Sequence, residues 1–155
     1  MPVEATEHAG PVIIWRKELA QDSGGIGEFR GGLGQHMEVS LAEGHECDFS
    51  AMFDRVNHPA HGRHGGASGA STSVKLDDGT ILKGKGKQFI PHGRKAILEF
   101  PGGGGYGNPA QRDKTSIKND FARGYTSKET AQADYGLTDL EIESITKLVK
   151  QGAYE

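Results

Sequence analysis

Three histidines spaced by three residues could provide metal-binding chemistry. His58, His61 and His64 lie in the stretch HPAHGRH at 58–64. If this stretch is extended with three residues per turn, all three imidazoles lie along one edge. Cys47 or His45 could add a fourth ligand, the number that a structural zinc site needs. Residues three apart rise about 9 Å along such a segment, so one shared ion requires a bend. Surface histidines that bind nothing are the alternative.

Asp54 and Arg55 directly precede this histidine stretch and close a predicted strand. An arginine there could hold a carboxylate or phosphate with two parallel hydrogen bonds. Asp54, Arg55 and His58 are therefore the candidate catalytic residues, with a structural ion pair at the strand end as the alternative. We interpret Cys47, two residues after His45, as a buried and inert thiol rather than a nucleophile.

The glycine clusters do not have the spacing of a nucleotide-binding loop. No G-x-x-x-x-G-K-[ST] motif occurs, and the nearest dinucleotide fingerprint, GIGEFR at 25–30, has Arg30 where the third glycine belongs. The cluster GGGGYG at 102–107 leads into Asn108 and Pro109 rather than directly into a helix that could face an anion. We expect no cofactor bound by this chain alone, apart from the zinc candidate above.

The composition limits the hydrophobic core that the chain can build. Leu, Ile, Val and Phe make up 30 of its 155 residues, whereas Gly contributes 24. A chain of this length typically forms one domain. Glycine adds no side chain to a core and loses the most backbone entropy on ordering. We therefore expect a fold that depends on a partner polypeptide for part of its stability.

Several classes of protein are disfavoured by the same sequence. The net charge of -3 provides no basic surface for nucleic acid. No apolar run approaches the roughly 18 residues that span a membrane. The first residues lack a signal-peptide pattern, and a single cysteine is incompatible with a disulfide framework. The expected location is the cytoplasm.

The glycines divide the chain into two regions, because 20 of the 24 lie between Gly24 and Gly107. Residues 1–109 are predicted to form a glycine-rich β body, and residues 110–155 a helical tail that is not an independent domain. Expected strands, from alternating or β-branched patterns, are 12–15, 37–41, 49–53, 74–76 with 81–82 as a hairpin, and 94–100. The predicted fold is mainly β, with short β-sheets in a barrel-like arrangement. The glycine clusters are expected to form polyproline-II-like segments packed side by side, with flexible loops as the alternative.

The tail is predicted to contain three short helices with recognisable start and stop signals. The first covers about 114–123, and the others open with capping boxes, in which two residues satisfy each other's backbone amides. The boxes pair Thr126 with Glu129 and Thr138 with Glu141, and Gly124, Gly136 and Gly152 follow the three helices.

Four motifs, in order, give the sequence a family resemblance. They are DSGGIGEFRGGLG at 22–34, DRVNHPAHG at 54–62, the glycines of 65–69, and PGGGGYGNP at 101–109, followed by Arg112-Asp113 and Tyr135-Gly136. From about residue 12 to 137 the chain resembles the C-terminal portion of the hydantoinase B / 5-oxoprolinase family. Asp54, Arg55 and His58 fit the family pattern, whereas Ala60 and His61 depart from it.

The resemblance implies a function within a larger assembly. The family usually carries this segment at the end of a much larger subunit, whereas here it begins at Met1. Such a free-standing segment resembles the small (beta) subunit of acetophenone-type ketone carboxylases, which use ATP to convert acetophenone and bicarbonate to benzoylacetate. The implied partners are hydantoinase-A-like ATPase subunits and a large hydantoinase-B-like subunit. ATP and a divalent metal are expected on these partners, and residues 138–155 are expected to be a docking element.

Two alternative functions stay open from the sequence. Within the family, the chain could be a subunit of an ATP-dependent hydantoinase or 5-oxoprolinase. Outside it, the chain could be a non-enzymatic, glycine-rich scaffold protein.

Overall fold

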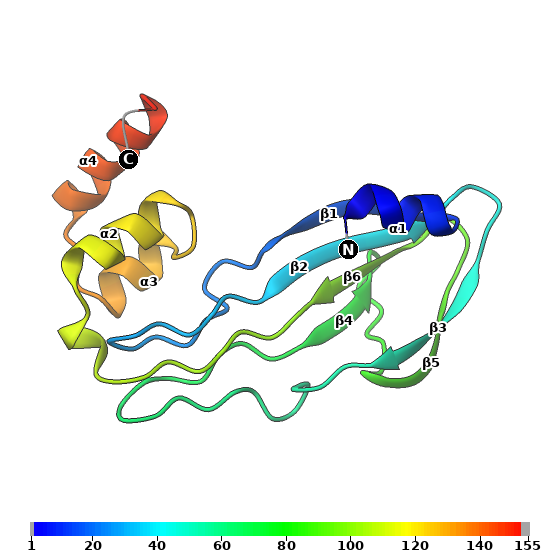
Figure 1. Ribbon diagram of the computed structural model, residues 1–155, viewed down its shortest axis with the longest axis horizontal. Coiled ribbons are helices and arrows are strands. Elements are labelled where there is room, and N and C mark those ends of the chain that lie inside the picture. The colour runs from blue at the N-terminus through cyan, green and yellow to red at the C-terminus, as the bar shows by residue number, and fades with distance from the viewer. Residues whose placement is uncertain (1, 153–155) are drawn as a thin grey trace.

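The computed structural model describes residues 2–152, which form an elongated β body with a helical tail at one end (Figure 1). The elements are α1 (Val3–Ala9), β1 (Val12–Leu19), β2 (Gln35–Leu41), β3 (Cys47–Met52), β4 (Ser73–Leu76), β5 (Lys85–Ile90), β6 (Lys95–Glu99), a short 3-10 helix (Pro109–Gln111), α2 (Lys114–Ala122), α3 (Lys128–Ala133) and α4 (Asp139–Lys150). The fold is mainly β with a few helices, as predicted; α2, α3 and α4 follow the strands, whereas α1 lies within the predicted β body.

The strands of the described region form two open antiparallel sheets, so the barrel-like arrangement was wrong. One sheet has the order β1-β2-β6-β4, and β3 pairs with β5 alone. At each edge strand of the larger sheet, a residue close in sequence forms a hydrogen bond or bridge to the strand. The Glu7 carboxylate accepts a hydrogen bond from the Ile14 amide at 2.8 Å beside β1, and Lys75 of β4 bridges to Ile81. These local contacts take the place of the strand pairing that would close a barrel.

Most predicted strands are confirmed, but two elements were missed. The turn after β4 is present, since the Leu76 amide donates to the Thr80 carbonyl at 2.9 Å. Strand β5, sequence KGKQFI, has no alternating apolar pattern and is exposed over most of its length. It forms because it pairs residue by residue with β3. Helix α1 buries no residue, so no amphipathic pattern indicates it.

The glycine-rich segments 24–34, 60–69 and 101–107 are packed against one another rather than loose. Backbone hydrogen bonds cross between them, including the Gly25 amide to the Gly103 carbonyl at 2.9 Å and the Ala67 amide to the Ile26 carbonyl at 2.8 Å. A Cβ atom added to Gly25 would lie 2.1 Å from the Ala67 carbonyl oxygen, and one on Gly102 1.8 Å from the Ser23 carbonyl oxygen. Only glycine permits this approach. The polyproline-II conformation itself stays a prediction.

The three tail helices have the predicted order and nearly the predicted ends. Helix α4 begins with the expected capping box of Thr138 and Glu141. In α3 the capping residue is Ser127, which accepts from the Thr130 amide, so the predicted Thr126–Glu129 box was displaced by one residue. Thr126 is instead buried, and its hydroxyl does not cap the helix.

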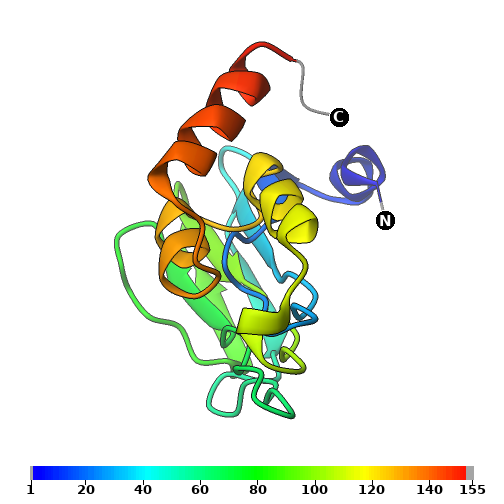
Figure 2. The same ribbon diagram turned by 90° about the vertical axis from the view of Figure 1, so that its left-hand side faces the viewer.

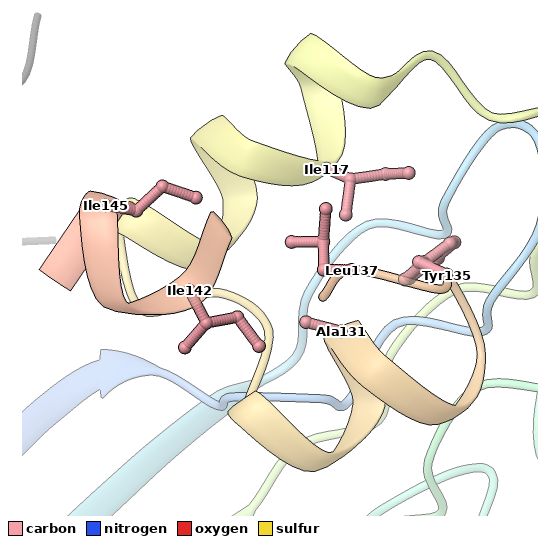
Figure 3. Close-up of a cluster of buried hydrophobic side chains, with 6 residues drawn as sticks. All are labelled: Ile117, Ala131, Tyr135, Leu137, Ile142 and Ile145. Atoms are coloured by element: carbon pink, nitrogen blue, oxygen red, sulfur yellow. The ribbon is translucent and has the colours of Figure 1, made fainter. Parts of the chain in front are cut away.

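Figure 2 shows the helices of the tail grouped at one end of the molecule. They pack around a side-chain core of their own (Figure 3). The buried cluster consists of Ile117, Ala131, Tyr135, Leu137, Ile142 and Ile145, all at most 8% exposed. Ile26, from the first glycine segment, packs against it. The tail therefore has its own hydrophobic core, to which the body contributes Ile26.

A partly buried ion network joins the tail to the glycine segments. Asp120 of α2 accepts hydrogen bonds from Arg30 at 2.9 and 3.2 Å and from Arg112 at 2.6 Å. Arg112 also donates to the Glu28 carbonyl oxygen at 3.1 Å. Asp22 adds a second joint, because its side chain accepts from the Ser127 amide at 3.0 Å. The helices are thus held at the end of the body by polar contacts to the Arg30 and Asp22 side chains and the Glu28 carbonyl, in addition to the packing of Ile26.

The body has a much smaller core than the tail. Its buried cluster contains Leu76, Ile90 and Ala96, with Phe49, Leu82 and Leu98 only partly buried around them. Large apolar side chains elsewhere in the body are exposed, including Trp15 at 57%, Met52 at 79% and Phe29 at 63%. Among residues 2–152, no helix has both the length and the hydropathy to cross a membrane.

Candidate functional site

The three candidate catalytic residues line one cleft beyond the end of β3. Asp54, Arg55 and His58 border a cleft of about 290 Å³, together with Phe53, Val56, Asn57, Gly84 and Lys85. The sequence placed the three residues together because they lie within five positions. It did not indicate Lys85, which arrives from β5 only through the pairing of β3 with β5.

Asp54 forms its close ion pair with Lys85 rather than with its neighbour Arg55. The Lys85 ammonium lies 2.6 Å from the Asp54 carboxylate. This hydrogen bond is the main reason that the pKa of Asp54 lies below its usual value, with a smaller contribution from the charge of Arg55. The Asp54–Arg55 ion pair considered from the sequence is therefore replaced by a cross-strand pair. Both partners are largely exposed, so water screens the interaction.

The turn at Arg55 is held by a buried threonine. Arg55 has a positive φ of 61°, an uncommon conformation for a residue with a side chain. Thr72 donates from its hydroxyl to the Asp54 carbonyl at 2.6 Å and from its amide to the Arg55 carbonyl at 3.1 Å. Since Thr72 is only 4% exposed, these bonds fix the backbone that carries the candidate residues. Such a turn could present Arg55 and His58 to an anionic group.

The histidine stretch does not converge on one position in the described part of the chain. His58 lines the cleft, His61 lies 3.4 Å from the Ser68 hydroxyl, and the His64 ring packs 4.9 Å from the Tyr106 ring. Residues 2–152 contain no group of three His, Cys, Asp or Glu side chains that could hold a metal. The donor set therefore does not fit a zinc ion within this chain, and zinc stays a prediction that requires a ligand from elsewhere.

Cys47 is separate from the histidine stretch, at the start of β3. Its side chain is partly buried, and burial raises the pKa of its thiol. A thiol that stays protonated is a weak nucleophile. This environment agrees with the interpretation of Cys47 as inert.

An exposed aromatic cluster lies where the glycine segments end, and the sequence analysis did not identify it. Phe29 and Tyr106 pair through two backbone hydrogen bonds of 2.9 Å, with ring centroids 6.3 Å apart. The His64 ring packs against Tyr106 with the two ring planes tilted by 52°, and its backbone is in a left-handed turn with φ 52°. The signal available in the sequence was one aromatic residue within each of two glycine clusters.

A second, larger cleft lies where the charged face of the sheet meets the tail. It has a volume of about 610 Å³ and is bordered by residues of β1, β2 and β6 and by the loop after α2. His36 lies in it with its Nδ1 atom 2.6 Å from the Glu99 carboxylate and its Nε2 atom 3.3 Å from Glu38. Both ring nitrogens are engaged, which leaves no nitrogen for a substrate. Only the packing of the tail onto the sheet creates this cleft.

The packed glycine segments, the two open sheets and the helical tail together define a mainly β module. The hydrophobic core of its body is small. A family model described as Hydantoinase B/oxoprolinase matches residues 1–109. The chain belongs to this family, as the resemblance indicated.

Three relatives show the range of enzymes that contain this module. The chain is 32% identical over 151 residues to the B subunit of a putative D-/L-hydantoinase from Pseudomonas sp. (strain NS671), covering 93% of this chain and 25% of that protein. It is 32% identical over 146 residues to the caprolactamase beta subunit of Pseudomonas jessenii, with coverages of 87% and 24%. It is 26% identical over 166 residues to the acetophenone carboxylase delta subunit of Aromatoleum aromaticum, with coverages of 85% and 24%.

Two solved structures contain the same fold within larger chains. The ATP-dependent caprolactamase from Pseudomonas jessenii superposes with a TM-score of 0.75 at 26% identity, over 97% of this chain and 28% of that one. Nucleotide-free acetone carboxylase superposes with a TM-score of 0.74 at 16% identity, over 98% and 26%. The chain therefore spans about a quarter of the length of the relatives it matches. Its relatives are subunits of multi-subunit enzymes of the carboxylase and amidase type.

Proposed function

We propose that the chain is a component that completes the hydantoinase-B-like part of an ATP-dependent enzyme complex. Its role is in assembly and not in catalysis by itself. The observation that carries this proposal is the small core of the body, in which three residues form the buried cluster while Trp15, Phe29 and Met52 are exposed. A partner polypeptide that covers these surfaces would supply the burial that the body lacks.

Ketone carboxylation is the first reaction that we propose for the complex, with acetophenone and bicarbonate as substrates. The family resemblance and the likeness to the acetophenone carboxylase delta subunit, at 26% identity, support it. Hydantoinase-A-like ATPase subunits would bind ATP, and a large hydantoinase-B-like subunit would be the direct partner, with the divalent metal on these partners. In such a complex Asp54, Arg55 and His58 would border a cleft shared with the partner.

Cyclic-amide hydrolysis coupled to ATP is the second candidate reaction. The identity of 32% to the hydantoinase and caprolactamase subunits exceeds the 26% to the carboxylase subunit, over alignments of similar length. This difference favours an amidase complex. Ring opening and carboxylation can be distinguished directly, because only carboxylation consumes bicarbonate.

Co-expression tests the assembly role. The chain alone should be poorly soluble and should show a broad thermal transition by fluorescence of Trp15, its only tryptophan. Co-expression with hydantoinase-A-like and large hydantoinase-B-like subunits should yield a soluble complex whose ATP hydrolysis depends on either a ketone with bicarbonate or a cyclic amide. A sharp unfolding transition of a purified monomer would contradict the proposal and favour a stand-alone scaffold.

Metal analysis of the purified complex tests the zinc hypothesis. Replacing His58, His61 and His64 by Ala should lower the zinc content if these residues bind the metal together with a partner ligand. An unchanged zinc content would eliminate the histidine stretch as a metal site.

A further inference from the structure

An apolar cavity lies between the two sheets of the body. Its volume is about 190 Å³, its surface is wholly apolar, and it is lined by side chains of β1, β2, β3, β5 and β6. The lining includes Val12, Val39, Leu41, Cys47, Phe49 and Leu98. These six residues are all only partly buried, so the space between the sheets opens to the surface.

The side chains of this part of the chain leave this open apolar space unfilled. Protein cores, in contrast, are packed to the density of organic crystals. A wholly apolar cavity offers water no hydrogen-bond partner, whereas one of roughly 150 Å³ is large enough to bind benzene. The cavity between the sheets is therefore large enough for one ring-sized or leucine-sized group, and its lining selects an apolar one.

The tail of this chain cannot supply that group. In Figure 1 the β3–β5 pair lies at the end of the body near α1, whereas α2, α3 and α4 lie at the opposite end. Relatives with the same fold are about four times as long, since this chain covers 24% to 28% of them. Protein outside this segment is thus available in the family to fill the cavity.

We infer that the cavity is a docking pocket for one apolar side chain of the large hydantoinase-B-like partner, an inference that rests on the proposed function. The pocket adds a defined contact point to that function. Its single cysteine is a built-in reporter, because Cys47 lines the cavity and is the only cysteine in the chain.

Thiol labelling gives the first test. The rate at which N-ethylmaleimide modifies Cys47 is measured by mass spectrometry of its peptide, in the complex with the large partner and in the chain alone. The chain alone is kept in solution as a fusion to a carrier protein without cysteine, and a Ser50→Cys variant labelled in the same two states reports any general change in folding. A seated side chain should slow the reaction by roughly tenfold or more, because the thiolate would lose access to the reagent. Equal rates in the two states would overturn the inference.

Filling the pocket from within gives the second test. Cys47→Phe places a ring in the cavity and should weaken binding of the large partner by roughly tenfold or more. The smaller Cys47→Leu should have the same direction of effect if the phenylalanine variant misfolds. Ser50→Phe is the matched control, since Ser50 is exposed on the same strand and points to the opposite face. The control should bind normally.

The remaining outcomes separate this inference from the proposed function. If the two chains associate but Cys47 stays reactive and Cys47→Phe binds normally, the docking pocket is wrong while the assembly role stands. If the chain never associates with the large partner, both fail. Protection of Cys47 by benzene or by self-association of the chain, without protection by the large partner, would also overturn the inference.

Discussion

The body and the tail of this protein are held together by different interactions. In the tail, six buried side chains pack around one another, as in a conventional helical domain. In the body, glycine backbones approach within van der Waals contact and hydrogen-bond across segments, for example from the Gly105 amide to the Ala67 carbonyl at 2.9 Å. Side-chain burial is non-directional, whereas backbone packing requires specific positions without Cβ atoms. The two regions should therefore respond to different substitutions.

The largest effect is expected from a methyl group placed inside the glycine packing. A Cβ on Gly31 would lie 2.1 Å from the Gly103 carbonyl oxygen, whereas one on the adjacent Gly32 meets nothing within 4 Å. Gly31→Ala should destabilise the body by more than about 3 kcal/mol, the upper end for overpacking. Hydrogen-exchange mass spectrometry of the complex should show lost protection at 22–34 and 101–107, with the tail core still protected.

Gly32→Ala is the matched control for this prediction. It should be neutral, or stabilising by about 0.4–1 kcal/mol through the unfolded chain. Equal effects of the two substitutions would mean that the body is not held by close backbone approach.

A slightly smaller effect is expected at the joint between the regions. Asp120→Ala leaves Arg30 and Arg112 without their shared carboxylate, and both arginine side chains are at most 17% exposed. Leaving partly buried charges of this kind unpaired costs about 2–3 kcal/mol, below the range for fully buried pairs. Both the tail and segment 22–34 should exchange faster, whereas Asp134→Ala, an exposed change in the same tail, should alter neither. An effect limited to the tail would show that the network does not couple the regions.

The tail core should respond as an ordinary hydrophobic core. Ile142→Ala removes a side chain that is 4% exposed, whereas Leu140 in the same helix is 79% exposed. The first change should cost about 2–3 kcal/mol by leaving a cavity, and Leu140→Ala should stay within about 0.5 kcal/mol. The loss of exchange protection should be confined to 114–150. An equal loss of exchange protection in the glycine segments would show that the two regions are not stabilised independently.

The smallest effect concerns acid stability of the tail. A hydrogen bond from the Thr138 backbone, helped by Lys118 and the Thr138 hydroxyl, lowers the pKa of Glu141 from 4.5 to about 2. The folded form therefore prefers the ionised carboxylate. Its stabilising contribution is present above pH 4.5 and is lost as the pH falls toward about 2.

Glu141→Gln tests this assignment. In urea titrations followed by the helical circular-dichroism signal, the variant should show a weaker loss of stability across this pH window than the parent chain. A pH dependence identical to that of the parent would contradict the role of Glu141.

Local signals were sufficient for much of the tail but not for all of the body. Thr138 and Glu141 predict the start of α4 because capping is a contact between residues three apart. Even there, Ser127 rather than Thr126 caps α3, because Thr126 is buried by tertiary packing. Strand β5 and the Asp54–Lys85 pair could not be predicted locally, since each depends on a partner more than 30 positions away.

The candidate site shows the same division. Asp54, Arg55 and His58 lie within five positions of one another in the sequence, and in the structure they border one cleft. Their catalytic role stays a prediction. The regular three-residue spacing of the histidines suggested a shared ion, but His61 contacts Ser68 and His64 contacts Tyr106 in the fold. The first contact depends on how segment 60–69 folds back on itself, and the second on the packing of segment 101–107 against it, so the spacing alone could not predict either.

By itself, the sequence determined that this protein has a glycine-rich β body with little side chain to bury, a capped helical tail, and a place in the hydantoinase B/oxoprolinase family. Composition, capping residues and the order of motifs can all be identified from the amino-acid sequence. Only the tertiary structure decided that the sheets stay open, that Asp120 joins the two regions, and that an apolar cavity lies between the sheets. These features depend on contacts between distant segments, whose free energy is set by how the whole chain packs.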